Sequence, residues 1–139
     1  MHTPTVETAL LSSLKQNTHN ARTHSKKQIS QIASSIRTFG WTQPILADDQ
    51  GNVIAGHGRL AAALELKLRT APVIYCSGLT EIQKRALAVA DNKIAANAGW
   101  DRQVLAAELG ELATLLPECN LDLSITGFEA AEIDSLMGD

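Results

Sequence analysis

The sequence has few cysteines, few aromatic residues and no long apolar run. Its two cysteines, Cys76 and Cys119, are far apart and form no Cys-x-x-Cys pair, which favours reduced thiols. No apolar segment approaches the roughly 20 residues that span a bilayer, and the N-terminus lacks the basic-then-apolar order of a signal peptide. Aromatic residues make up only 4% of the chain, too few for a platform on which single-stranded bases stack. We therefore expect a cytoplasmic protein with no membrane partner.

The length and composition are those of one ordinary globular domain. The chain has 139 residues, of which 45% are hydrophobic and 19% charged. A chain of this size can bury a core without disulfides or a structural metal. Collagen, coiled-coil and wholly disordered proteins are excluded by the same figures.

Charge is distributed unevenly along the chain. The formal net charge is -3, but every Lys and Arg lies between Lys15 and Arg102. Residues 1–102 therefore have a net charge of +5, and residues 103–139 have a net charge of -8. The mildly acidic net charge of the whole chain therefore does not argue against the binding of a polyanion by residues 1–102.

One basic segment stands out in the first part. No acidic residue occurs between Glu7 and Asp48, and this interval contains the candidate DNA-binding residues Arg22, Lys26, Lys27 and Arg37. Two interpretations remain open, a solvated helix face and a basic surface that contacts DNA.

Alternating helix and strand signals predict an α+β fold in which helices pack on a small mixed β-sheet. The expected helices are 26–39, 59–68, 80–96, 101–116 and 129–137, and the expected strands are 44–47, 53–55 and 71–75. A short apolar stretch at 6–14 fits either a strand or a helical turn. Pro72 favours the beginning of a strand or a sheet edge.

Two parts are expected from this order, a domain at 1–100 and a helical, acidic C-terminal extension at 101–139. The extension contains the leucines Leu105, Leu109, Leu112 and Leu116 at helical spacing. This stripe predicts a core face, with docking of a partner helix as the alternative.

The most informative local feature is Gly56-His57-Gly58-Arg59, between a predicted strand and a predicted helix. The glycines allow close backbone approach, the helix N-terminus attracts anions, and the Arg can form a charge-assisted contact with a phosphate oxygen. The alternative is an ordinary tight turn with a solvated His57. The motif matches neither the Walker loop nor the dinucleotide fingerprint.

Three boxes in a fixed order resemble the ParB/sulfiredoxin-like superfamily. They are Gly40-Trp41-Thr42-Gln43-Pro44-Ile45, then Gly56-His57-Gly58-Arg59 followed by Ala62 and Ala63, and then Asp91-Asn92-Lys93. The version fused ahead of bacterial and phage DNA methyltransferases is the most similar, because this chain also contains Asn20-Ala21-Arg22-Thr23-His24-Ser25 and Asn97-Ala98-Gly99-Trp100.

The resemblance implies a fold that holds a nucleoside triphosphate, ATP or CTP, with Mg²⁺. Asp91 and Asn92 would then be ligands to Mg²⁺, and His57 and Gln43 would be catalytic candidates. The residues implied in binding the phosphates are Gly40, Thr42, Gln43, Gly56, His57, Gly58 and Arg59.

Departures from the family patterns restrict the activity. His57 stands where sulfiredoxins have their nucleophilic cysteine, so repair of oxidised peroxiredoxin is not expected. His57 and Gly58 replace the Glu-Arg pair of the partition branch, which leaves the choice of nucleotide open. The chain has no [DN]-P-P-[YF] motif and is therefore not itself a methyltransferase.

Three functions remain open at this point. The first is binding, with or without hydrolysis, of a nucleoside triphosphate in DNA modification, partition or mobile-element maintenance. The second is a non-catalytic DNA-docking or adaptor module that works with a methyltransferase domain or protein. The third is a Mg²⁺-dependent DNA nuclease.

Overall fold

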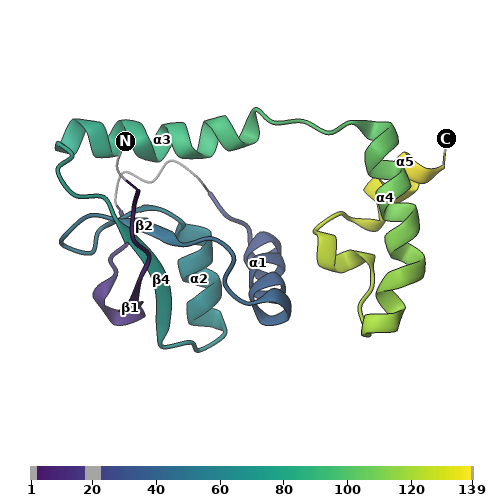
Figure 1. Ribbon diagram of the computed structural model, residues 1–139, viewed down its shortest axis with the longest axis horizontal. Helices are drawn as coiled ribbons and strands as arrows, with labels where there is room; N and C mark the ends of the chain where they lie inside the picture. The colour runs from purple at the N-terminus through teal and green to yellow at the C-terminus, as the bar shows by residue number, and fades with distance from the viewer. Residues whose placement is uncertain (1–2, 18–22, 139) are drawn as a thin grey trace. The chain divides into compact units, whose positions relative to one another are not determined.

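A computed structural model describes residues 3–17 and 23–138, and these form two compact units, residues 1–97 and residues 98–139. The first unit contains a four-stranded mixed sheet with helices, which confirms the expected α+β class (Figure 1). Within the described residues, no helix combines the length and the apolar character that crossing a bilayer requires.

The sheet has the strand order β1-β4-β2-β3. Strands β1 (Glu7–Leu10) and β4 (Thr70–Tyr75) are antiparallel, β4 and β2 (Ile45–Ala47) are parallel, and β2 and β3 (Val53–Ala55) form an antiparallel hairpin. The apolar stretch at 6–14 is therefore a strand, followed by the 3₁₀ turn η1 (Leu11–Ser13).

The position of β4 corrects the edge-strand interpretation of Pro72. β4 pairs with a strand on each side and is an interior strand. Pro72 is tolerated there because the parallel ladder with β2 begins only at Val73, so the missing N–H falls just before that ladder.

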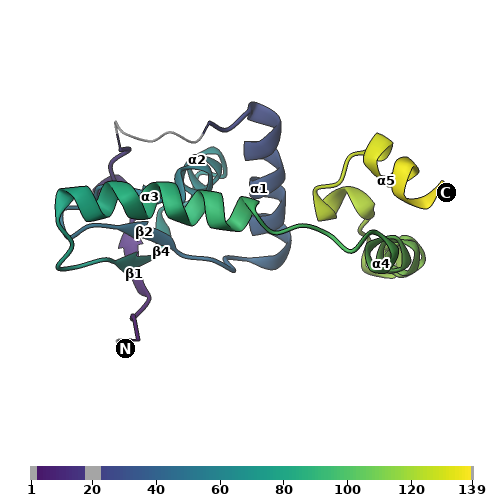
Figure 2. The same ribbon diagram turned by 90° about the horizontal axis from the view of Figure 1, so that it is seen from above.

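Helices α1 (Lys26–Phe39) and α2 (His57–Glu65) pack against each other on one side of the sheet, and α3 (Glu81–Ala96) runs across the ends of the strands beside β3 (Figures 1 and 2). The Ser25 hydroxyl accepts the N–H of Gln28 at the start of α1, and a full capping box at Thr80 begins α3. Helix α2 begins two residues earlier than expected, at His57.

The core of residues 1–97 lies between the sheet and α2. Ile45, Ala47, Val53 and Val73 from the strands are fully buried, and Leu60 and Ala63 from α2 pack on them. In contrast, none of the side chains of α3 is buried, so the apolar residues of this helix lie outside the buried core. Ile82 is 80% exposed and Ile94 is 69% exposed.

Residues 98–139 form a separate unit of short helices. It contains α4 (Arg102–Leu115), the 3₁₀ turns η2 (Leu116–Cys119) and η3 (Leu123–Thr126), and α5 (Ala130–Met137). Asp101 caps α4 by accepting the N–H of Val104, as its position in the sequence predicted.

Candidate functional site

The turn from β3 into α2 is shaped by Gly56. Its φ of +101° lies in the left-handed region, and it occupies the N-cap position of α2 without a side chain that could accept a hydrogen bond. The N–H groups of the first turn and the positive end of the helix dipole therefore face outward from this point. This arrangement suits an anion.

Close packing leaves little room for a side chain at either glycine of the turn. A Cβ atom on Gly56 would lie 3.2 Å from Cγ1 of Ile45, and one on Gly58 would lie 2.9 Å from the ring of His24 and from Cδ1 of Ile32. A larger residue at the start of α2 would therefore require a shift of Ile45 or of the His24 and Ile32 side chains.

A cavity of about 230 Å³ lies at this turn and joins three segments that are far apart in the sequence. It brings together residues of the second and third sequence boxes, which the family resemblance placed around one nucleotide, and adds residues at the start of α1 and one from α3. Its lining residues from the boxes are Gly56, His57, Gly58, Arg59, Asp91 and Asn92.

Sequence reasoning missed four lining residues, His24, Gln28, Ile32 and Ala95. Nδ1 of His24 donates to Oε1 of Gln28 at 3.0 Å, which fixes the His24 ring beside the turn. The available signal was the segment ending in His24-Ser25, which the family comparison singled out without assigning it to the site.

His57 is half-buried and already has a partner. The backbone N–H of Asn17 donates to Nε2 of His57 at 3.1 Å, so Nε2 carries no proton. Burial, together with the nearby His24, lowers the pKa of His57 below its ordinary value. His57 is therefore a neutral ring near pH 7, with its proton on Nδ1.

Arg59 and Gln43 are linked across the first two boxes. Nη2 of Arg59 donates to Oε1 of Gln43, and Arg59 lines the cavity whereas Gln43 does not. Gln43 therefore orients the guanidinium group from outside the cavity.

The structure does not bring Gly40 and Thr42 to the cavity. Gly40 ends α1, where its N–H donates to the carbonyl oxygen of Ile36 at 2.8 Å. Thr42 is exposed. Neither residue lines the cavity.

Asp91 and Asn92 face the cavity from α3. Asp91 is exposed, and Nδ2 of Asn92 donates to the carbonyl oxygen of Ala88 at 2.8 Å, which orients the amide. Within residues 3–17 and 23–138, no group of three or more His, Cys, Asp or Glu side chains is arranged to hold a metal. Mg²⁺ needs only one or two protein oxygens when phosphates complete its shell, so this pair fits a nucleotide-bound Mg²⁺.

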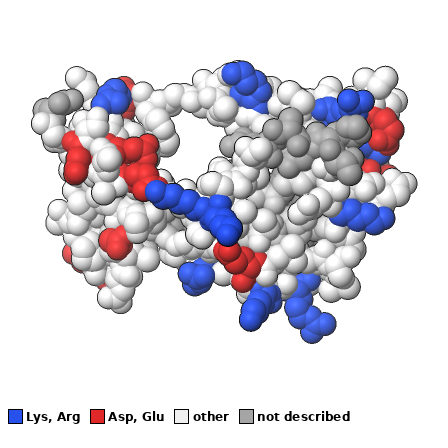
Figure 3. Space-filling model, turned by 180° about the vertical axis from the view of Figure 1, so that it is seen from behind, with Lys and Arg blue, Asp and Glu red and all other residues white. Residues whose placement is uncertain are grey.

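The candidate DNA-binding residues are spread along α1. Lys26 and Lys27 are in its first turn and Arg37 is in its last turn, and all three are exposed. Arg22 lies outside the described residues. On the face that Figure 3 shows, Lys and Arg side chains are scattered over the surface, and some of them lie beside Asp or Glu side chains.

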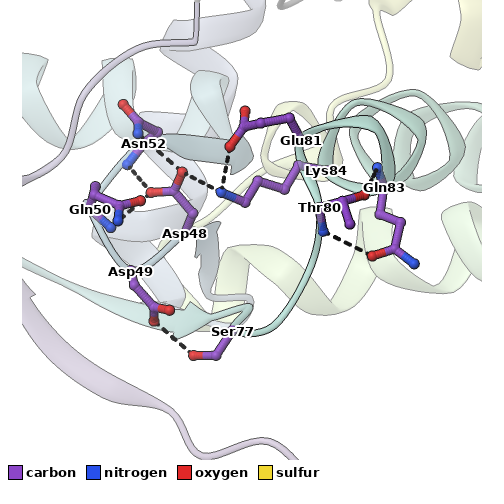
Figure 4. A network of polar contacts seen from close by, with 9 residues as sticks. All are labelled: Asp48, Asp49, Gln50, Asn52, Ser77, Thr80, Glu81, Gln83 and Lys84. Carbon is purple, nitrogen blue, oxygen red and sulfur yellow. Dashed lines mark hydrogen bonds and ion pairs between the residues drawn. The ribbon is translucent and has the colours of Figure 1, made fainter.

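A second polar cluster, which sequence reasoning also missed, fastens α3 to the hairpin (Figure 4). Asp48 is only 4% exposed, and it accepts hydrogen bonds from the backbone N–H groups of Gln50 and Asn52 and from Nδ2 of Asn52. Nζ of Lys84 on α3 lies 3.1 Å from Oδ2 of Asp48 and 2.9 Å from Oε1 of Glu81.

This cluster also sets the charge of Asp48. Burial raises the pKa of Asp48, but the hydrogen bonds from Asn52, Lys84 and Gln50 together outweigh burial and hold it below the ordinary value. The contact between Asp48 and Lys84 therefore joins the first turn of α3 to the hairpin.

Comparison with known proteins agrees with this architecture. Residues 1–93 match the ParB N-terminal domain, and residues 103–139 match the ParB-methyltransferase HTH domain. The ParB-like nuclease domain-containing protein YnaK of Escherichia coli K12 is 53% identical over 75 residues, which are 54% of this chain and 86% of that protein.

Solved structures show the same fold at low sequence identity. A truncated chromosome-partitioning protein ParB from Caulobacter crescentus, complexed with CTP-gamma-S, has a TM-score of 0.73 at 20% identity, over 96% of this chain and 77% of that chain. The same kind of ParB complexed to the centromeric parS site has a TM-score of 0.53 at 18% identity, over 96% and 65%. With the match over residues 1–93, these findings establish that the chain belongs to the ParB N-terminal domain family.

Proposed function

We propose that the cavity at the start of α2 binds the phosphates of a nucleoside triphosphate, together with Mg²⁺, in a DNA-related process. One observation carries this proposal. The N-terminus of α2, which no side chain caps, lines the same cavity as Arg59 and as Asp91 and Asn92, whose side chains contain oxygen atoms. The nucleotide in the structurally similar ParB complex supports the same assignment.

Each residue has a distinct part in this proposal. The amides of the Gly56–Arg59 turn donate to phosphate oxygens, and Arg59, oriented by Gln43, adds a charged contact. Asp91 and Asn92 would hold Mg²⁺, and a bound Mg²⁺ would neutralise part of the negative charge of the phosphates. If hydrolysis occurs, the neutral His57 is placed to orient water through Nδ1 rather than to act as an acid through Nε2.

Isothermal titration with CTP, ATP, GTP and UTP, with and without Mg²⁺, tests the proposal. Arg59→Ala should weaken binding by about 10- to 100-fold, because hydrogen bonds to charged groups are worth about 1.5–3 kcal/mol. Arg37→Ala is the matched control, since it removes an exposed arginine that does not line the cavity. Asp91→Asn should reduce only the part of the affinity that depends on Mg²⁺. Flat titrations with all four nucleotides would refute the proposal.

DNA docking through α1 is a second candidate, favoured by the three exposed cations of that helix and by the ParB structure bound to parS. Phosphate contacts of this kind position a duplex without reading its sequence. Binding should fall steeply with salt, and Lys26→Ala with Lys27→Ala should lower the slope by about one unit per lost contact. Salt-insensitive binding would count against this candidate.

The nuclease alternative uses the same cavity, and it stays a prediction. Nicking of supercoiled plasmid should then require Mg²⁺ and should disappear in Asp91→Ala. Nicking that survives in this variant would place the activity elsewhere.

A further inference from the structure

The charge of residues 98–139 conflicts with the usual role of the domain that they resemble. Residues 103–139 match an HTH domain, and such domains place a helix in the major groove of DNA, with Lys and Arg contacting the phosphates. This span contains no Lys or Arg and has a net charge of -8. This net charge disfavours contact with DNA, which carries a dense negative charge.

The same unit has several exposed apolar side chains and few buried ones. Among its described side chains, Leu105 and Leu109 are the buried ones. Trp100 is 69% exposed and Val104 is 65% exposed, and the rings of Trp100 and Phe128 lie 5.4 Å apart, centre to centre. A unit this small rarely stabilises itself by its own core alone, so an apolar partner surface would add stability.

A groove of about 420 Å³ lies between α4 and α5 of this unit. The apolar residues that line it include Trp100, Leu105, Phe128 and Leu136, and Arg102 and Glu132 are the charged ones. Exposed aromatic side chains next to a concave apolar surface are typical of the centre of a protein interface.

We propose that this groove binds a segment of a partner protein that is apolar on one side and basic on the other. Charge complementarity selects this occupant, because the surrounding unit carries -8. A second copy of the same unit brings the same negative charge and is disfavoured for the reason that disfavours DNA. The apolar side of the segment contacts Trp100 and Phe128, and its cations lie near Glu132 and the other acidic residues.

The test uses the full chain and a synthetic helical peptide of about 18 residues, or five turns, with Leu on one side and Lys on the other. Two comparison peptides keep the length, one with Glu in place of Lys and one with Ser in place of Leu. We expect the Leu/Lys peptide to bind at least tenfold more tightly than either one in isothermal titration. The signals of residues 98–139 should shift in ¹H–¹⁵N spectra.

Two variants localise the binding. Trp100→Ala, at an exposed position, should weaken binding about tenfold. Glu132→Gln should weaken it about threefold; Oε1 of Glu132 accepts the N–H of Glu129 at 2.9 Å, and Gln can keep this capping contact. Glu118→Gln removes the same charge from an exposed residue that does not line the groove, and it should have a smaller effect.

Several results would overturn the proposal. The first is that the Leu/Lys peptide does not bind. The second is that the peptide with Ser in place of Leu binds as tightly as the Leu/Lys peptide. The third is that Trp100→Ala binds the Leu/Lys peptide with unchanged affinity. Shifts of residues 98–139 on addition of duplex DNA would show instead that this unit contacts nucleic acid despite its charge.

Discussion

Residues 1–97 and residues 98–139 differ in both packing and charge. The first unit buries a connected set of side chains between its sheet and α2 and has a net charge of +5. Among the described side chains of the second unit, only Leu105 and Leu109 are buried, and its net charge is -8. The first unit therefore has the packing needed to hold the left-handed turn at Gly56 in place. The second offers an acidic and partly apolar surface.

The largest expected effect is the unfolding of residues 98–139 while residues 1–97 stay folded. Leu109 is 1% exposed, and Leu109→Ala should cost about 3 kcal/mol, close to the whole stability of so small a unit. In ¹H–¹⁵N spectra the signals of residues 98–139 should collapse toward random-coil positions, while those of the sheet stay dispersed. Leu112→Ala, at a half-buried position, should leave most of the unit folded. Retained dispersion in Leu109→Ala would show that the core extends beyond this leucine.

The next effect is confined to residues 1–97. Gly56→Ala places a side chain at φ +101° and 3.2 Å from Ile45, so it should lower the free energy of unfolding by about 2 kcal/mol. Gly78→Ala is the control, because its φ is +80° but no atom lies within 4 Å of the added carbon, and its cost should be about 1 kcal/mol. Urea denaturation measures both, and equal losses would show that packing against Ile45 is unimportant.

The smallest effect concerns acid sensitivity, which we expect to reside in the first unit. The pKa of Asp48 is lowered in the folded state, so its contribution is present above about pH 4 and is lost as the pH falls further. Asp48→Asn should therefore flatten the decline of Tm between pH 5 and pH 3. Lys84→Met should flatten it partly, since it removes one of the contacts that lower this pKa. An unchanged decline in both variants would contradict the prediction.

Much of the fold was predictable because local signals coincide with the elements. The Ser25 and Thr80 caps mark the starts of two helices, and the polar residues between Ala47 and Val53 mark the hairpin turn. The interior position of β4 was not predictable, because Pro72 argues locally for an edge and strand order depends on pairing over long distances.

The candidate site was predictable in part for the same reason. The turn at Gly56 is a local motif, but the approach of Asp91 from α3 followed only from the family resemblance. The contact of His57 with Asn17, like that of Asp48 with Lys84, joins segments without any shared sequence signal. Periodicity predicted α3 as a helix, but it shows only that a helix has an apolar side and not whether anything covers that side.

The pairing of β1 with β4 has a consequence for how the protein folds. Glu7 in β1 pairs with Val73, so the sheet closes only after most of the first unit is in place. Closing so long a loop costs entropy before its contacts form, and topologies of this kind fold more slowly than local helices. During synthesis the β1 segment emerges early and waits for β4, whereas α4 needs only its own neighbours. A chaperone that shields an unpaired strand would therefore act on β1 while the segments between β1 and β4 are still being made.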